Sequence, residues 1–165
     1  MRLSVDPIRL SVTPTLIAVL FAAGPSRVEA GNTMVVRATV VRSCNVAALP
    51  MMFGTVSILL PDASVQTPIF VDCTPFTSYS VAIDNGQNFN GQRRMIRTGP
   101  GFGSFLNYEI YSDPARTQRW GTSAGQVITG TAPANGKATH FAYGRTAGFI
   151  AAGPFEDTVT ITVTF

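Results

Sequence analysis

In the segment DTVTITVTF, residues 157–165, polar and apolar side chains alternate without a break from Thr158 to Phe165. In an extended chain, Val159, Ile161, Val163 and Phe165 fall on one side, and the threonines between them fall on the other. A period of two residues is typical of a β-strand with one buried face, because apolar residues of an amphipathic helix recur every three or four positions. This stretch therefore predicts a C-terminal strand that covers a core.

Short segments of the same type fill most of the chain and are separated by glycine, proline and asparagine. The dipeptides Asn85-Gly86, Asn90-Gly91 and Asn135-Gly136 favour tight turns with positive φ. No long helical period occurs after the first 30 residues, and only a turn is expected near 112–120. We predict strands near residues 51–59, 66–73, 78–84, 92–97, 105–111, 126–130, 137–144 and 157–165. Many short strands in a chain that is 45% hydrophobic predict one all-β sandwich or small barrel.

The first 30 residues have the order of a secretory signal peptide. Arg2 and Arg9 precede an apolar run at residues 16–24, and small residues end the segment at Ala30. The run is shorter than the roughly 20 residues that a transmembrane helix needs. An N-terminal core helix is the alternative, but prolines bracket the run. We therefore expect export and a mature chain of residues 31–165.

The segment that follows, GNTMVVRATVVRSCN at residues 31–45, also has a period of two. Its first face consists of Met34, Val36, Ala38 and Val40, and Arg37 lies on the other face with Val35, Thr39 and Val41. This pattern predicts a strand. The pattern alone leaves open whether the strand pairs within its own chain or with another one.

Cys44 and Cys73 are the two cysteines of the chain. In an exported protein an even pair predicts a disulfide, which would contribute about 3.6 kcal/mol on the chain-entropy model. Two buried free thiols are the alternative. His140 is the single histidine, so the sequence does not support a zinc site.

Two glycine-rich motifs resemble catalytic or phosphate-binding loops. GTSAG, residues 121–125, would make Ser123 a hydrolase nucleophile only on a strand-to-helix turn, and no alternation of strands and helices surrounds it. GPGFGS, residues 99–104, lacks the glycine that a dinucleotide fingerprint requires at position 106. His140 is interpreted as a sheet residue. We expect loops at both motifs, with no catalytic residue, no metal and no cofactor.

Basic residues cluster at RRMIR, residues 93–97, in a chain with a formal net charge of +3. The expected role of this cluster is a solvated strand face, because no run of aromatic residues adjoins it to stack nucleotide bases. We therefore expect no nucleic-acid partner.

Several segments between Cys44 and Phe165 occur in a characteristic order, which is SCNV, FGTV, IFVDCTPFTSYSVAIDNG, LNYEIYSDPARTQRWG, YGR and DTVTITVTF. Together they resemble the spore coat protein U domain family, which covers subunits of archaic chaperone-usher pili in Gram-negative bacteria.

The resemblance implies an incomplete immunoglobulin-like β-sandwich that is completed by donor-strand exchange. Residues 1–30 would be the signal peptide, 31–43 the N-terminal donor-strand extension and 44–165 the sandwich domain. Cys44 and Cys73 match the family's disulfide pair. The implied donor-strand residues are Met34, Val36, Ala38 and Val40. The implied groove and chaperone-docking strand carries Val159, Ile161, Val163 and Phe165.

The resemblance also implies the partners and the location of the protein. They are a periplasmic chaperone, an outer-membrane usher and identical or related pilin subunits, on a chain exported to the cell surface as a fimbrium or secreted. Such a fibre would support adhesion or biofilm formation. The alternative is a self-complete secreted coat or surface protein whose first strand pairs within its own sheet.

Overall fold

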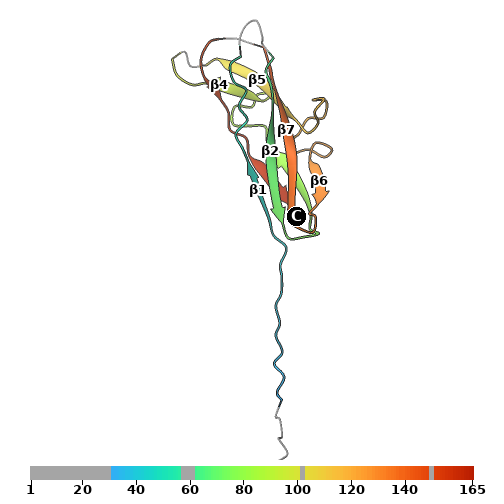
Figure 1. Ribbon diagram of the computed structural model, residues 1–165. Coiled ribbons are helices and arrows are strands. Elements are labelled where there is room, and N and C mark those ends of the chain that lie inside the picture. The colour runs from blue at the N-terminus through green and yellow to red at the C-terminus, as the bar shows by residue number, and fades with distance from the viewer. Residues whose placement is uncertain (1–30, 57–61, 101–102, 149–150) are drawn as a thin grey trace, which may run out of the picture. The chain divides into compact units, whose positions relative to one another are not determined.

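The computed structural model describes residues 31–56, 62–100, 103–148 and 151–165 (Figure 1). The chain divides into two units, Met1–Ala38 and Thr39–Phe165. In the first unit, residues 31–38 are exposed and belong to no strand. The predicted signal peptide, residues 1–30, lies outside the described residues.

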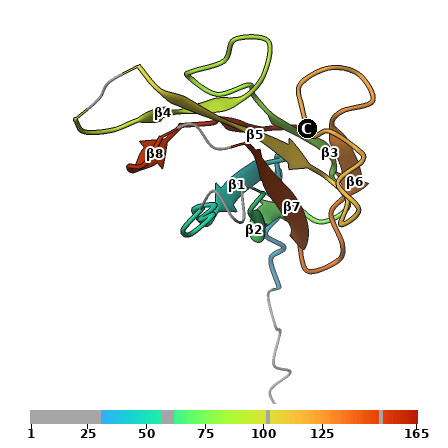
Figure 2. The ribbon, with the colours of Figure 1, turned by 90° about the horizontal axis from the view of Figure 1, so that it is seen from above.

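The second unit is all-β, with no helix among the residues that the structure describes. Its strands are β1 (Cys44–Ala48), β2 (Ser64–Cys73), β3 (Ser78–Ile83), β4 (Arg94–Arg97), β5 (Phe105–Tyr111), β6 (Ile128–Thr131), β7 (Lys137–Ala147), β8 (Phe155–Glu156) and β9 (Ile161–Thr164). A six-stranded sheet has the order β1-β2-β7-β5-β4-β8, and a three-stranded sheet has the order β6-β3-β9 (Figures 1 and 2). All strand pairs are antiparallel.

Most of the predicted strands are confirmed, and the range 105–111 coincides with β5. The strand expected at 51–59 is wrong for residues 51–56, which pair with no strand, and the rest of that range lies outside the described residues. The chain is paired one segment earlier, in β1, where Asn45 and two alanines gave no strand signal. Pairing with β2 overrides that weak local propensity.

The predicted C-terminal strand is shorter than expected. Residues 157–160 have no strand assignment, and only Ile161–Thr164 pair with β3. The amide of Thr160 donates to the side chain of Asp84 instead of to a backbone carbonyl. A side-chain acceptor therefore replaces one of the two backbone hydrogen bonds of the Asp84–Thr160 pair just before β9.

The core consists of alternate residues that face inward from both sheets, including Ile69, Val81 and Ile110. Trp120 is fully buried, and its Nε1 donates to the carbonyl of Val81 at 2.9 Å. Cys44 and Cys73 lie directly opposite each other on β1 and β2 and form a disulfide. The disulfide prediction is confirmed.

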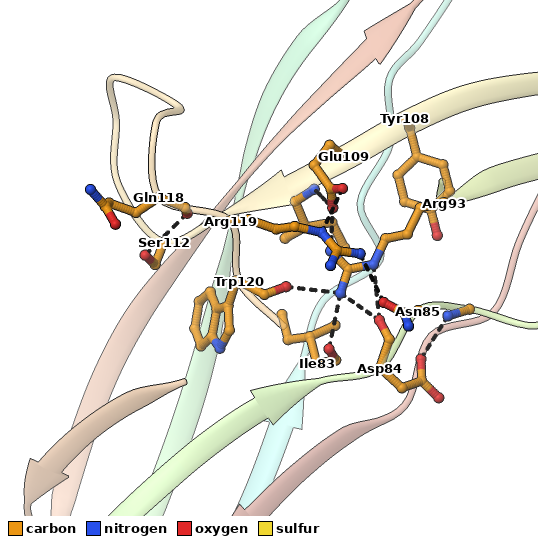
Figure 3. A network of polar contacts seen from close by, with 12 residues as sticks. Ile83, Asp84, Asn85, Arg93, Tyr108, Glu109, Ser112, Gln118, Arg119 and Trp120 are labelled. Atoms are coloured by element: carbon orange, nitrogen blue, oxygen red, sulfur yellow. Dashed lines mark hydrogen bonds and ion pairs between the residues drawn. The ribbon is translucent and has the colours of Figure 1, made fainter. Parts of the chain in front are cut away.

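Arg93 corrects the expectation of a solvated basic face at residues 93–97, because its side chain is fully buried. The guanidinium donates to the carbonyls of Ile83 at 2.9 Å and Trp120 at 2.8 Å (Figure 3). It also donates to the carbonyl of Asp84 and pairs with Glu109. Position 93 shares the inward face with Met95, and the long arginine side chain on that face reaches the backbone carbonyls of Ile83, Asp84 and Trp120.

Candidate functional site: an apolar groove beside the last strand

Two adjoining cavities of about 670 Å³ and 660 Å³ form a groove along the sandwich. One wall is residues 48–56, which begin at the last residue of β1, and the other is residues 151–159 together with Ile161, the first residue of β9. The two cavities share mostly apolar residues, which are Met51, Met52, Phe53, Met95, Pro154 and Phe155. The groove therefore offers apolar contacts along an extended path.

The first wall is held against β2 and β7. The hydroxyl of Thr67 donates to the carbonyl of Pro50 at 3.2 Å. Phe53 packs edge-to-face on Tyr108, with ring centroids 6.1 Å apart. On β7, a Cβ at Gly144 would lie 2.4 Å from the sulfur of Met51. A glycine at this position thus lets the wall approach the sheet closely.

The second wall is held by two carboxylates. Asp157 accepts hydrogen bonds from the Tyr108 hydroxyl at 2.7 Å and from Asn88 Nδ2 at 2.9 Å. Burial, together with the bond to Asp157, raises the pKa of Tyr108 above its ordinary value, so the hydroxyl stays a donor. Asp84 accepts from the amides of Thr160 and Gly86, each at 2.9 Å.

Burial alone would raise the pKa of Asp84. The hydrogen bonds from Thr160 and Gly86 outweigh that effect and hold this pKa below its ordinary value. The Asp84 carboxylate is therefore ionised at neutral pH, and it fixes the backbone immediately before β9.

β9 is the last strand of its sheet and carries an unpaired edge among the described residues. The amide of Asp84 donates to the carbonyl of Thr160 at 2.9 Å. The backbone amides and carbonyls of the even-numbered residues of this strand therefore point toward β3. The amide of Ile83, opposite Ile161, donates elsewhere, to Gly121. Because hydrogen-bonded pairs alternate in antiparallel sheets, the amides and carbonyls of Ile161 and Val163 point away from β3.

The alternation predicted for the side chains is confirmed within the strand. Val159, Ile161 and Val163 are half-buried against the core, and the threonines between them are exposed. Val159 and Ile161 line the groove, whereas Val163 packs farther along the core. Phe165 lies beyond the end of β9, is 55% exposed and lines neither of the two cavities.

The sequence pattern does not indicate the other groove residues. It predicts a strand at Met51, Met52 and Phe53, and it assigns no site role to Met95 or Phe155. An apolar cluster, MMF, next to proline was the available signal.

The proposed donor residues are all exposed. Met34, for example, has 86% of its surface exposed, and Val36 and Val40 are similar. Residues 31–43 belong to no strand. The carbonyl of Val41 accepts from the hydroxyl of Thr74 at 3.4 Å, which attaches the end of this segment to the sandwich.

Ser123 and His140 line neither cavity of the groove. Ser123 is exposed in a turn that no helix follows, in agreement with the predicted loop. His140 is half-buried on β7, where its Nε2 and the Tyr79 hydroxyl are 2.9 Å apart, and burial lowers its pKa. Among the described residues, no three acidic, histidine or cysteine side chains gather as metal ligands. The described chain also holds no helix of the length and apolar character needed to cross a bilayer.

The model of the Spore Coat Protein U domain matches residues 30–162. The chain belongs to this family. The match covers most of the chain, including the groove and β1 to β8. No curated protein sequence matches the chain.

Two solved structures of complexes contain chains similar to this one. The first is the CsuC-CsuE chaperone-tip adhesion subunit pre-assembly complex from archaic chaperone-usher Csu pili of Acinetobacter baumannii. Its matching chain is 24% identical with a TM-score of 0.60, over 77% of this chain and 41% of that one. The second, a chaperone-tip adhesin complex of CFA/I fimbriae, has 11% identity and a TM-score of 0.41, over 73% and 38%. This family member thus spans less than half of each matching chain, and the first likeness supports the β-sandwich fold.

Proposed function

We propose that this chain is a structural subunit of a chaperone-usher surface fibre. Its N-terminal segment, residues 31–43, enters the groove of a neighbouring subunit as the missing strand. The observation that carries the proposal is the unpaired edge of β9 beside an apolar groove. The same chain supplies an exposed segment with the matching period of two residues.

Strand addition accounts for both the unpaired edge of β9 and the exposed N-terminal segment. The outward amides and carbonyls of Ile161 and Val163 accept a new strand through backbone hydrogen bonds. The side chains of Met34, Val36, Ala38 and Val40 then enter the groove, and Arg37 stays outside. Residues 34–40 span about 20 Å when extended, which suits a groove built from two adjoining cavities. Filling the groove also removes an edge that would otherwise promote aggregation.

The proposal extends to the partners and the location of the protein. A periplasmic chaperone fills the groove first, an outer-membrane usher assembles the fibre, and identical or related subunits follow one another. The similarity to a chain in a chaperone-subunit complex supports the chaperone as a partner. The predicted signal peptide supports export to the cell surface, where the fibre serves adhesion or biofilm formation. In this role the chain has no catalytic activity.

A self-complete coat protein is the competing function. It requires a strand of the same chain on the edge of β9, and the described residues contain none. The proposed fibre subunit fits this edge better.

A peptide of residues 31–43 tests the proposal. The acceptor is the mature chain with Val36→Asp, which keeps the groove and disables the donor segment. We expect the wild-type peptide to bind this chain and raise its Tm, and a peptide with the same substitution to bind at least tenfold more weakly. Equal effects of the two peptides, or no binding, would contradict strand exchange.

A further inference from the structure

Phe76 is a bulky apolar residue held in an unfavourable position on the surface. It lies in the loop between β2 and β3, with 74% of its surface exposed and a φ of 61°. That conformation is rare for residues with a large side chain. Its amide donates to the carbonyl of Ala132 at 2.9 Å, which fixes the backbone. The loop therefore presents an aromatic ring to solvent at a cost to the isolated subunit.

The same loop holds the base of the N-terminal segment. The amide of Thr74 donates to the carbonyl of Ser43 at 2.8 Å, and its hydroxyl accepts from the amide of Ser43 at 3.1 Å. The disulfide joins the next residue, Cys44, to Cys73. Phe76 is thus two positions from the residue that anchors the exit of the segment.

The distance available at a joint between subunits is short. The following steps rest on the proposed function, in which Val40 lies in the groove of the neighbour. Four residue steps separate Val40 from Cys44, and an extended chain covers at most about 14 Å over that length. The mouth of the neighbour's groove must therefore lie close to the loop that carries Phe76.

The groove has a near end and a far end relative to the disulfide. β1 begins at Cys44, and residues 44–50 run beside β2. After them, Met51 and Phe53 lie against Gly144 of β7. Gly144 pairs with Val65, near the start of β2 and far from Cys73. If residues 31–43 entered the neighbour's groove at the near end, two copies could insert their segments into each other and form a closed dimer. Entry at the far end repeats without closure and builds a fibre.

Among the described residues, two large apolar side chains of the groove walls are exposed, and Met52 is farther along the chain from the disulfide than Leu49. Met52 lies where the two cavities meet. It lines both cavities, yet 74% of its surface is exposed. A flexible thioether and an exposed aromatic ring form a favourable contact. We propose that Phe76 of one subunit packs against Met52 of the next, as a second contact between copies beside the inserted strand. This contact stabilises and orients the joint.

Phe76→Asn tests this contact without disturbing the subunit, because asparagine tolerates a positive φ. We expect fibres of the mature variant to dissociate about tenfold faster than wild type in denaturant. The matched control is Phe89→Asn, which removes a 42% exposed aromatic ring from another loop and should change the rate less than twofold. Equal rates for Phe76→Asn and wild type would overturn the proposal.

Two further measurements separate the possible failures. In the Val36→Asp chain, Phe76→Asn should leave the affinity for the 31–43 peptide unchanged, because the peptide lacks the second subunit's loop. Failure of that peptide to bind at all would overturn the proposed function and this contact together. In fibres that carry Met52→Ala, the added effect of Phe76→Asn should disappear. A persisting tenfold effect would overturn Met52 as the partner.

Discussion

The hydroxyl of Tyr108 donates a hydrogen bond to Asp157 at 2.7 Å and so joins β5 to the segment before β9. Both residues line the groove. The bond fixes one wall of the groove to its floor, and its removal should therefore loosen the edge that accepts a strand.

Tyr108→Phe removes this donor and keeps the ring. We expect a loss of about 1–2 kcal/mol in the free energy of unfolding, because Asp157 keeps its bonds from Asn88 but loses one partner. Urea unfolding of the monomeric Val36→Asp chain measures this change. Tyr111→Phe, on the opposite face of β5, is the control and should change stability by less than about 0.5 kcal/mol. Equal effects would contradict the assigned role.

Arg93→Met should be among the most damaging substitutions in the chain. It leaves the carbonyls of Ile83 and Trp120 and the carboxylate of Glu109 without the donor that they share, and we expect a loss of about 3–5 kcal/mol. Arg94→Met is the control, since Arg94 lies over the Phe105 ring at 3.8 Å on the outer side. Urea unfolding measures the loss of stability in each variant. Similar losses for Arg93→Met and Arg94→Met would contradict the importance of the buried Arg93 contacts for stability.

Stability should fall in mild acid because of His140. Burial lowers the pKa of this imidazole in the folded chain below its ordinary value of 6.5. The unfolded state then binds a proton first as pH falls below about 6.5, so folding stability decreases from there downwards. Unfolding measurements between pH 8 and pH 5 should show this decrease, and His140→Gln should flatten it. An unchanged slope in the variant would assign the effect to other groups.

The effect of a charged substitution on fibre assembly should depend on which face of the donor segment, residues 31–43, carries it. We expect aspartate at Val36 or Val40 to reduce fibre assembly by more than about 100-fold, because an unpaired carboxylate would enter an apolar groove. Aspartate at Arg37 or Thr39 should be tolerated. Light scattering and electron microscopy of the mature chains measure assembly. Similar losses at Val36 and Thr39 would contradict the predicted register.

The sequence predicted the all-β class and most strands because alternation and turn residues are local signals. It could not place β1, whose weak propensity is overridden by pairing with β2 and by the disulfide. The sequence pattern also predicted that Arg93 faces solvent. It could not show the burial of Arg93, because the carbonyls that accept its hydrogen bonds come from segments far apart in the chain. Of the predicted groove strand, Val159 and Ile161 reach the groove, whereas the wall that contains Met51 and Phe53 depends on packing against Gly144.

The central claim is that a strand from another copy covers the free edge of β9. Amide hydrogen exchange of the Val36→Asp chain, with and without the 31–43 peptide, tests it at single residues. The amides of Ile161 and Val163 should exchange rapidly in the free chain and become protected in the complex, whereas Thr162 should be protected in both. Unchanged exchange at Ile161 and Val163 on peptide binding would contradict the account.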